Sequence, residues 1–193
     1  ALALLGSAVT GCNRNRQEAI ILANQADGFV DTSPADAISK YEEAVKLDPT
    51  NHAILFKLAK AYKKKEDWEK AQGALQRAVE KQPANGEYWF ERGNAIEQQA
   101  RKPDKGGAKW SDCIEPYTKC IEKDPHDDRC YYHLAQAYHW TDDEQKALQK
   151  ISEAIEQRPS DEGARKKKCI EDLNAERVHP SLIEFRRERL TRR

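Results

Sequence analysis

Four prolines recur at nearly constant spacing along this chain of 193 residues. They are Pro49, Pro83, Pro125 and Pro159, each at the end of a short polar run such as KLDP or EKDP, and the intervals between them are 34, 42 and 34 residues. A fixed period of this length indicates a fold built from one small structural unit used several times.

The residues between the prolines repeat as well. The second unit holds two sets of apolar or small residues, which are Leu55, Leu58, Ala59 and Tyr62, then Ala71, Leu75 and Ala78. The fourth unit holds the equivalent sets, which are Tyr131, Leu134, Ala135 and Tyr138, then Ala147, Ile151 and Ala154. Spacings of three and four residues place each set on one face of a helix, and such a face is buried only when helix pairs stack.

These units resemble tetratricopeptide (TPR) repeats, whose pattern runs W-x2-L-G-x2-Y, then A-x3-F, then a small residue and proline. The resemblance covers roughly residues 16 to 178 and implies an all-α fold, a right-handed superhelical TPR solenoid of about four helix pairs plus a C-terminal capping helix. We expect repeats at about 16–49, 50–83, 84–125 and 126–159. Residues 160–193 would form the capping helix, with Cys169 in a small-residue place, and a basic tail.

Two of the expected repeats are irregular. The first has a turn, DGFVDTSPAD, that is about two residues longer than usual. The third carries eight extra residues around QQARKPDKGGAKW, and Arg92 stands where leucine is expected. Pro116 falls inside its second helix, where it removes a hydrogen bond and is expected to kink the start of that helix.

The chain opens with the apolar stretch ALALLGSAVTGC, followed by the polar run NRNRQE. Its last four residues, VTGC, resemble the lipobox of bacterial lipoproteins, so residues 1–12 are interpreted as the remnant of a lipoprotein signal peptide. The resemblance implies lipidation of Cys12, and Asn13 at the next position implies a lipid anchor at the periplasmic face of the outer membrane. An ordinary cleavable signal, or a short buried N-terminal helix with Cys12 as a small hydrophobe, remains open.

The cysteines beyond residue 12 are interpreted first as small structural residues. In the TPR register Cys113, Cys120 and Cys169 occupy places that favour alanine or glycine. Cys113 and Cys120 lie seven residues apart, about 10 Å along one helix, which is too far for a bridge. Cys120 and Cys130 flank one inter-repeat turn, and they form the possible disulfide that an oxidising periplasm would permit.

The sequence offers no motif for chemistry or for nucleic-acid binding. It contains no GxSxG, P-loop, dinucleotide fingerprint or CxxC motif. The best candidates for zinc ligands are Cys130, His133 and His126, and no second motif supports a zinc site. We therefore expect no enzyme activity, no metal and no cofactor. Because 33 basic residues balance 33 acidic ones, no overall field draws the chain to nucleic acid.

The TPR resemblance implies an inner, concave face lined by the first helix of each repeat. The side chains expected to bind a partner there are Phe56, Lys57, Lys60, Lys63, Glu87, Phe90, Glu91, Asn94, Glu97, Arg129, Tyr132, His133, Gln136 and His139. Aromatic anchors beside charges suit the capture of a peptide or a helix. The alternative is that this face is exposed to solvent and binds no partner.

Taken together, these features predict a scaffold for protein–protein interaction. The leading hypothesis is a lipid-anchored TPR lipoprotein of the outer membrane that assists assembly of, or forms part of, a cell-envelope complex such as a pilus, secretion or motility machine. It is similar in architecture to pilotin-type TPR lipoproteins. One alternative is the lipoprotein partner of the β-barrel assembly machinery. Another is a soluble peptide-binding co-chaperone, although Phe56 and Glu91 stand where its carboxylate clamp wants amide or basic groups.

Overall fold

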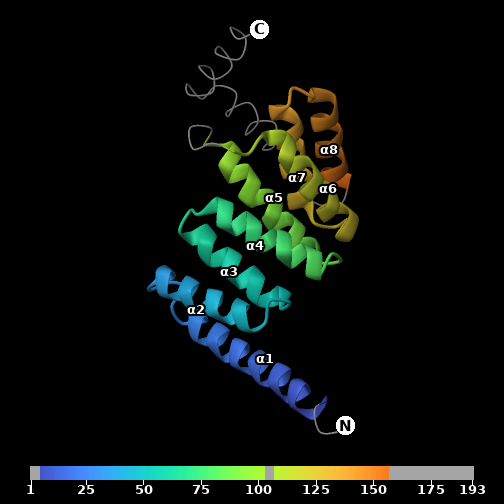
Figure 1. The fold of residues 1–193 in the computed structure, drawn as a ribbon. Helices are drawn as coiled ribbons and strands as arrows, with labels where there is room; N and C mark the ends of the chain where they lie inside the picture. The colour runs from blue at the N-terminus through green and yellow to red at the C-terminus, as the bar shows by residue number, and fades with distance from the viewer. Residues whose placement is uncertain (1–4, 103–106, 157–193) are drawn as a thin grey trace.

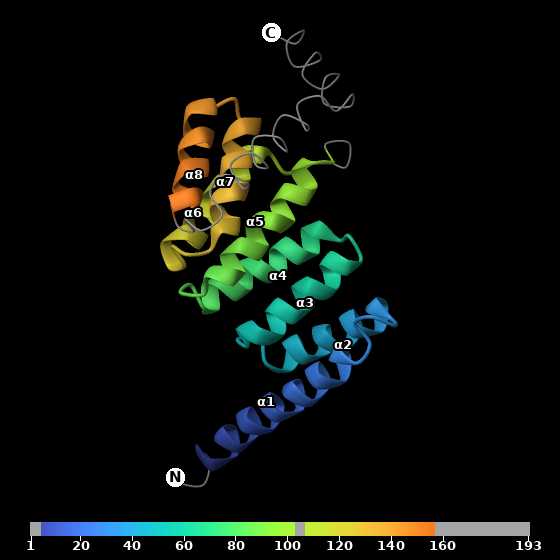
Figure 2. The same ribbon diagram turned by 180° about the vertical axis from the view of Figure 1, so that it is seen from behind.

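The computed structural model shows a stack of helices connected by short turns (Figure 1; Figure 2 gives the view from behind). It describes residues 5–102 and 107–156. The elements in chain order are α1 (Leu5–Asp27), α2 (Pro34–Leu47), α3 (His52–Lys64), α4 (Trp68–Lys81), α5 (Gly86–Ala100), the 3-10 turn η2 (Trp110–Cys113), α6 (Ile114–Lys123), α7 (Asp128–Trp140) and α8 (Glu144–Glu156). No strand occurs in these two ranges.

The helices pack in pairs, and each pair packs on the next. The contacts within pairs join α1 to α2, α3 to α4, α5 to α6 with η2, and α7 to α8. Contacts between α2 and α3, α4 and α5, and α6 and α7 join successive pairs. The fold is therefore an all-α solenoid of TPR type, in which α1, α3, α5 and α7 are the first helices of the four pairs.

Three of the four periodic prolines lie in turns between described helix pairs, and a capping residue follows each of these turns. Two positions after Pro49, Pro83 and Pro125 come Asn51, Asn85 and Asp127, and their side chains accept hydrogen bonds from backbone N–H groups in the first turns of α3, α5 and α7. Such caps satisfy donors that a helix start leaves unpaired. The repeated proline thus predicts where a helix pair ends and the next one begins.

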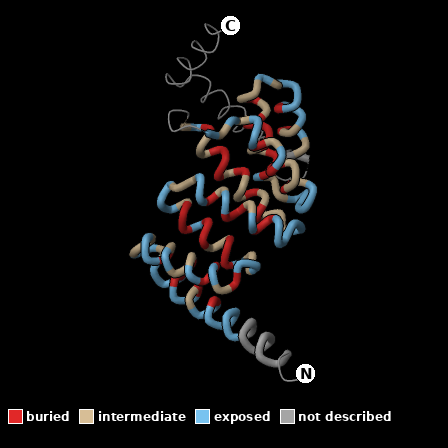
Figure 3. The backbone as a smooth tube through the Cα atoms, viewed as in Figure 1, coloured by how far each residue is buried: buried red, intermediate tan, exposed pale blue. Residues whose placement is uncertain are grey.

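Small residues allow the paired helices to approach closely. Ala23, Ala59, Gly93 and Ala135 hold equivalent places in the four first helices and are buried. At Gly93 a Cβ atom would lie 2.6 Å from Cε1 of Tyr117, closer than side chains tolerate. In Figure 3 the buried positions follow the sides of the helices that face one another along the stack.

The second helix of the third pair is irregular at its start, where the sequence predicts a kink. It begins as the 3-10 turn η2, and α6 follows from Ile114. Pro116 is the third residue of α6, where the missing N–H has no partner within the helix to lose. The proline therefore lies in the first turn of α6, and the irregularity expected there takes the form of the preceding 3-10 turn.

The sequence predictions for the two ends of the chain, a lipobox and a capping helix with a tail, stay predictions. The backbone of Cys12 lies within α1, which runs from Leu5 to Asp27 as one helix. The expected capping helix with Cys169, and the basic tail, lie outside the described residues. Among the described helices, none combines the length and the apolar character that a membrane span requires.

Candidate functional site

The first helices α1, α3, α5 and α7 together form one surface of the stack, here called the first-helix face. Ile20, Phe56, Phe90 and Tyr132 are equivalent positions on it, because the intervals between them, 36, 34 and 42 residues, follow the repeat lengths. The pattern of burial supports this alignment of the repeats. Ala19, Ala23 and Ala26 of α1 are buried, and they align with core positions of the other first helices.

The same pair of positions is bonded at each of the three junctions between successive first helices. Near the end of one first helix, a charged side chain pairs with a side chain in the middle of the next. The three pairs are Asp27 with Lys57 at 2.6 Å, Lys63 with Glu91, and Glu97 with His133 at 2.8 Å. Many charges on this face are thus satisfied by neighbouring repeats, and they align the repeats with one another.

The three pairs differ strongly in their exposure to solvent. The side chains of Lys57 and Asp27 are 41 % and 43 % exposed, whereas those of Lys63 and Glu91 are 19 % and 12 % exposed. In the third pair the Glu97 side chain is 2 % exposed. The first-helix face is therefore open around α1 and α3 and closed around α5 and α7.

Glu97 is the centre of a buried polar network at the third junction. Its Oε2 accepts a hydrogen bond from the Tyr117 hydroxyl at 2.6 Å and lies 2.8 Å from Nδ1 of His133, while Arg101 donates to Oε1 at 2.9 and 3.1 Å. Burial alone would raise the pKa of Glu97, but the hydrogen bond and charge of His133, the Tyr117 hydroxyl and the charge of Arg101 together hold that pKa below its ordinary value. A buried carboxylate with this many partners stays ionised and stabilises the junction.

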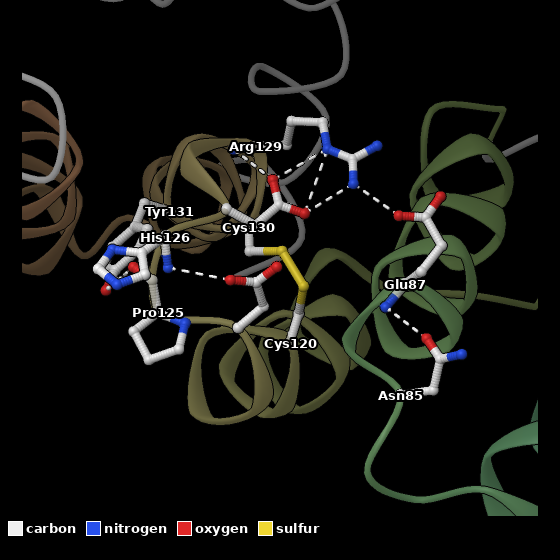
Figure 4. Close-up of a disulfide and its surroundings, with 10 residues drawn as sticks. Asn85, Glu87, Cys120, Pro125, His126, Arg129, Cys130 and Tyr131 are labelled. Atoms are coloured by element: carbon white, nitrogen blue, oxygen red, sulfur yellow. Dashed lines mark hydrogen bonds and ion pairs between the residues drawn. A yellow bond between two sulfur atoms is a disulfide. The ribbon is translucent and has the colours of Figure 1, made fainter.

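Arg129 makes a second set of contacts at the same junction. Its guanidinium donates to Asp127 and, at 2.6 Å, to Glu87 of α5, and it lies 4.2 Å from the centre of the Phe90 ring. Hydrogen bonding to Asp127 is the largest cause that raises the pKa of Arg129 above its ordinary value. Arg129 therefore serves mainly to hold α7 against α5 (Figure 4).

A disulfide joins Cys120 of α6 to Cys130 of α7 directly beneath this contact (Figure 4). The two Cα atoms lie 6.0 Å apart, and both residues are fully buried. This is the pair that the sequence indicates as the possible disulfide. Cys113 is a free, buried thiol, and burial, with the negative charge of Glu97, raises its pKa, so it is unreactive.

The structure corrects part of the predicted partner-binding set. Four of its members are buried and cannot present a side chain to a partner, and they are Phe90, Glu97, Gln136 and His139. Phe90 lies under Arg129 and against the His133 ring. Glu97 belongs to the network described above. Gln136 and His139 of α7 are each 2 % exposed.

The remaining members stay at least partly exposed, and they are Phe56, Lys57, Lys60, Lys63, Glu87, Glu91, Asn94, Arg129, Tyr132 and His133. Several are engaged with each other, since Lys63 also donates to Asn94 at 2.7 Å. Phe56 packs on the Tyr88 ring with 4.6 Å between centroids. Lys60 differs from the other lysines of this set, because among the described residues its partner is only the Phe56 ring, 5.6 Å away.

Sequence reasoning missed the contribution of α1 to this face. Ile20 and Ile21 are 49 % and 56 % exposed, and they are among the few large apolar side chains that the described residues leave open. The signal that could have found them is the repeat register, which makes Ile20 equivalent to Phe56.

The residues weighed for zinc do not converge in the structure. Cys130 is bonded to Cys120, while His133 is turned toward Glu97. Within the described part of the chain, a different group of three possible ligands, Cys120, Asp127 and Cys130, lies close together. Its two sulfur atoms are joined to each other, and its carboxylate binds Arg129.

Comparison with known proteins supports the same architecture. Residues 31–90, from the end of the first turn into α5, match the family model described as tetratricopeptide repeat. No curated protein matches the sequence. Several solved structures are similar, and those described next share less than a quarter of their residues with this chain at matched positions.

One structure described as the crystal structure of MamA protein has 22 % identity and a TM-score of 0.66 and covers 77 % of this chain and 76 % of its own. A second MamA crystal structure has 24 % identity and a TM-score of 0.62, with coverage of 72 % and 77 %. A MamA double mutant has 20 % identity and a TM-score of 0.60, with coverage of 79 % and 78 %. The chain therefore has the fold of a TPR solenoid.

Proposed function

We propose that this chain is a non-enzymatic TPR scaffold that is held at the periplasmic face of the outer membrane by lipid on Cys12 and binds a protein of a cell-envelope complex. The observation that carries the scaffold function is the first-helix face, which is closed by its own ion pairs around α5 and α7 and open around α1 and α3. A helical stack with one open portion suits the capture of a partner segment.

Two features support the proposed location at the periplasmic face of the outer membrane. The VTGC run at residues 9–12 has the composition of a lipobox. The Cys120–Cys130 disulfide fits an oxidising compartment such as the periplasm, because disulfides in reducing compartments are rare. The co-chaperone alternative fits less well, since Glu91, at a place where a carboxylate clamp needs a basic or amide group, is bonded to Lys63.

Intact-mass analysis of the protein from native membranes tests the proposed lipid anchor. A Cys12→Ser variant is analysed in parallel. We expect a mass that begins at Cys12 and includes acyl chains, and release of the variant from the membrane. An unmodified Cys12 in protein from native cells would refute the lipid anchor.

Quantitative co-purification from the membrane fraction then tests the role. Association at fixed stoichiometry in the mature complex identifies a structural subunit, whereas association confined to the assembly stage identifies an assembly factor. Co-purification with the β-barrel assembly machinery in place of a pilus, secretion or motility complex would select that alternative. Absence of any protein partner under crosslinking would refute the scaffold function.

A further inference from the structure

The junction between α6 and α7 brings three side chains together that are suited to binding a metal. Cys120 lies in α6, Asp127 is the N-cap of α7, and Cys130 lies in the first turn of α7. One atom of each, the two Sγ atoms and a carboxylate oxygen, all lie within 4.8 Å of one another. Both cysteines are fully buried, and the Asp127 side chain is 10 % exposed. While the disulfide is intact, the two sulfur atoms are bonded to each other and cannot act as thiolate ligands (Figure 4).

Reduction of this disulfide would leave two thiols at a spacing that one zinc ion can bridge. With Zn–S bonds of about 2.3 Å and tetrahedral angles, two sulfur atoms on one zinc lie about 3.8 Å apart, and a sulfur and a carboxylate oxygen lie about 3.5 Å apart. These separations fall within the 4.8 Å that spans the three ligand atoms. The Cα atoms of the two cysteines are 6.0 Å apart, so rotation of the side chains can separate the sulfur atoms without moving the helices. Two thiolates also favour zinc over calcium and magnesium, which take oxygen ligands.

Arg129 supplies the charge that a buried zinc site of this composition needs. Zinc with two thiolates and one carboxylate carries a single negative charge. The guanidinium of Arg129 carries one positive charge and donates to the Asp127 carboxylate at 2.7 and 2.9 Å, so the group as a whole is neutral. The same hydrogen bonds orient the carboxylate, as the partners of metal-bound carboxylates do. Glu87, which also accepts from Arg129, is 40 % exposed, so solvent screens its charge.

We propose that Cys120, Asp127 and Cys130 form a zinc site when their disulfide is reduced. A dithiol reductant breaks the S–S bond, becomes a disulfide itself and leaves one thiol on each cysteine. Zinc then binds both sulfur atoms and displaces the two thiol protons, while the Asp127 carboxylate supplies the third ligand and water the fourth. The junction between α6 and α7 is thus linked in either redox state, by a covalent bond or by a metal ion. This inference goes beyond the proposed scaffold function and does not depend on it.

The test titrates the full chain with Co²⁺, because thiolate ligands give Co²⁺ an intense near-ultraviolet absorption that oxygen ligands do not. The chain is measured in the oxidised form, and again after reduction and removal of the reductant under nitrogen. Zinc is then added to displace the cobalt. Three variants each remove one ligand, and they are Cys120→Ser, Cys130→Ser and Asp127→Asn. Three control variants each remove a cysteine outside the site, and they are Cys12→Ser, Cys113→Ala and Cys169→Ser.

We expect the reduced wild-type chain to bind a single Co²⁺ ion with thiolate absorption and to exchange it for zinc, and the oxidised chain to show no such absorption. Cys120→Ser and Cys130→Ser should abolish the absorption, whereas the three control variants should retain it. Asp127→Asn should weaken zinc binding about ten-fold or more, because the amide lacks the charge of the carboxylate, although it still caps α7. Zinc should also raise the melting temperature of the reduced chain and leave that of the oxidised chain unchanged.

Absence of thiolate absorption in the reduced wild-type chain would overturn the proposal. So would absorption that persists in Cys120→Ser, absorption that disappears in a control variant, or a zinc affinity that Asp127→Asn leaves unchanged. Circular dichroism shows whether each variant is folded. If a cysteine variant fails to fold, Asp127→Asn decides the question, because it keeps both thiols and the helix cap.

Discussion

Replacing Gly93 by alanine tests the packing of the third repeat most directly. A Cβ atom at this position would lie 2.6, 2.8 and 2.9 Å from three ring carbons of Tyr117, about 1 Å closer than carbon atoms normally pack. The ring cannot move aside easily, because Tyr117 is fully buried, its hydroxyl binds Glu97 at 2.6 Å, and it stacks on His133. Overpacking of this kind costs about 1–3 kcal/mol.

The better helix propensity of alanine offsets part of this cost, by about 1 kcal/mol. A net loss of up to about 2 kcal/mol lowers the melting temperature of a chain of this size by up to roughly 8 °C. Gly73→Ala is the matched control, because no atom lies within 4 Å of its new Cβ in α4. It should stabilise the chain by about 0.5–1 kcal/mol.

Thermal unfolding followed by circular dichroism measures both variants. A Gly93→Ala chain that melts at or above the wild-type temperature, or a Gly73→Ala chain that is equally damaged, would refute the proposed clash. A third variant separates a clash from a general loss of helix. Adding Tyr117→Leu to Gly93→Ala should recover part of the cost of the glycine change, because the ring that the new methyl group meets is gone.

Three further predictions concern the junctions between repeats. Because its partners hold the pKa of Glu97 below 4.5, this carboxylate stabilises the fold above about pH 4.5 and loses that effect as pH falls through the folded-state value. Melting temperatures between about pH 3 and pH 7 should fall less steeply for Glu97→Gln than for wild type, and parallel curves would contradict this. Replacing Cys120 and Cys130 together by alanine should cost about 2–3 kcal/mol in urea unfolding, and an unchanged midpoint would show that the disulfide does not form. A double-mutant cycle on Lys63 and Glu91 should give a coupling free energy of about 0.5–3 kcal/mol. A value near zero would show that the ion pair adds no stability beyond the packing of the two helices.

Much of the fold follows from the sequence pattern. The proline period and the three- and four-residue spacings predict paired helices, and Leu55, Leu75 and Leu134 are buried at the expected places. The start of α6 was harder to predict, because it depends on how the extra residues of the third repeat return to α5.

The candidate site was predictable only in part. Periodicity identifies the helix face on which Phe90 and His139 lie, but it does not tell how tightly the next repeat covers that face. Phe90 is buried because Arg129, 39 positions later in the chain, folds over its ring. Contacts of this kind depend on the angle between repeats, which no local pattern encodes.

The uneven closure of the first-helix face also bears on the order in which the chain unfolds. A solenoid is stabilised by nearest-neighbour coupling, and each repeat opens at a free energy set by the interfaces on its two sides. The buried Glu97–His133 pair and the disulfide strengthen the coupling around α5 to α7, whereas the ion pair that joins α1 to α3 is exposed to solvent. Hydrogen exchange should therefore be fastest in the first repeat. A partner bound against the first repeat would add an interface to it, so partner binding and the cooperativity of the array would be linked.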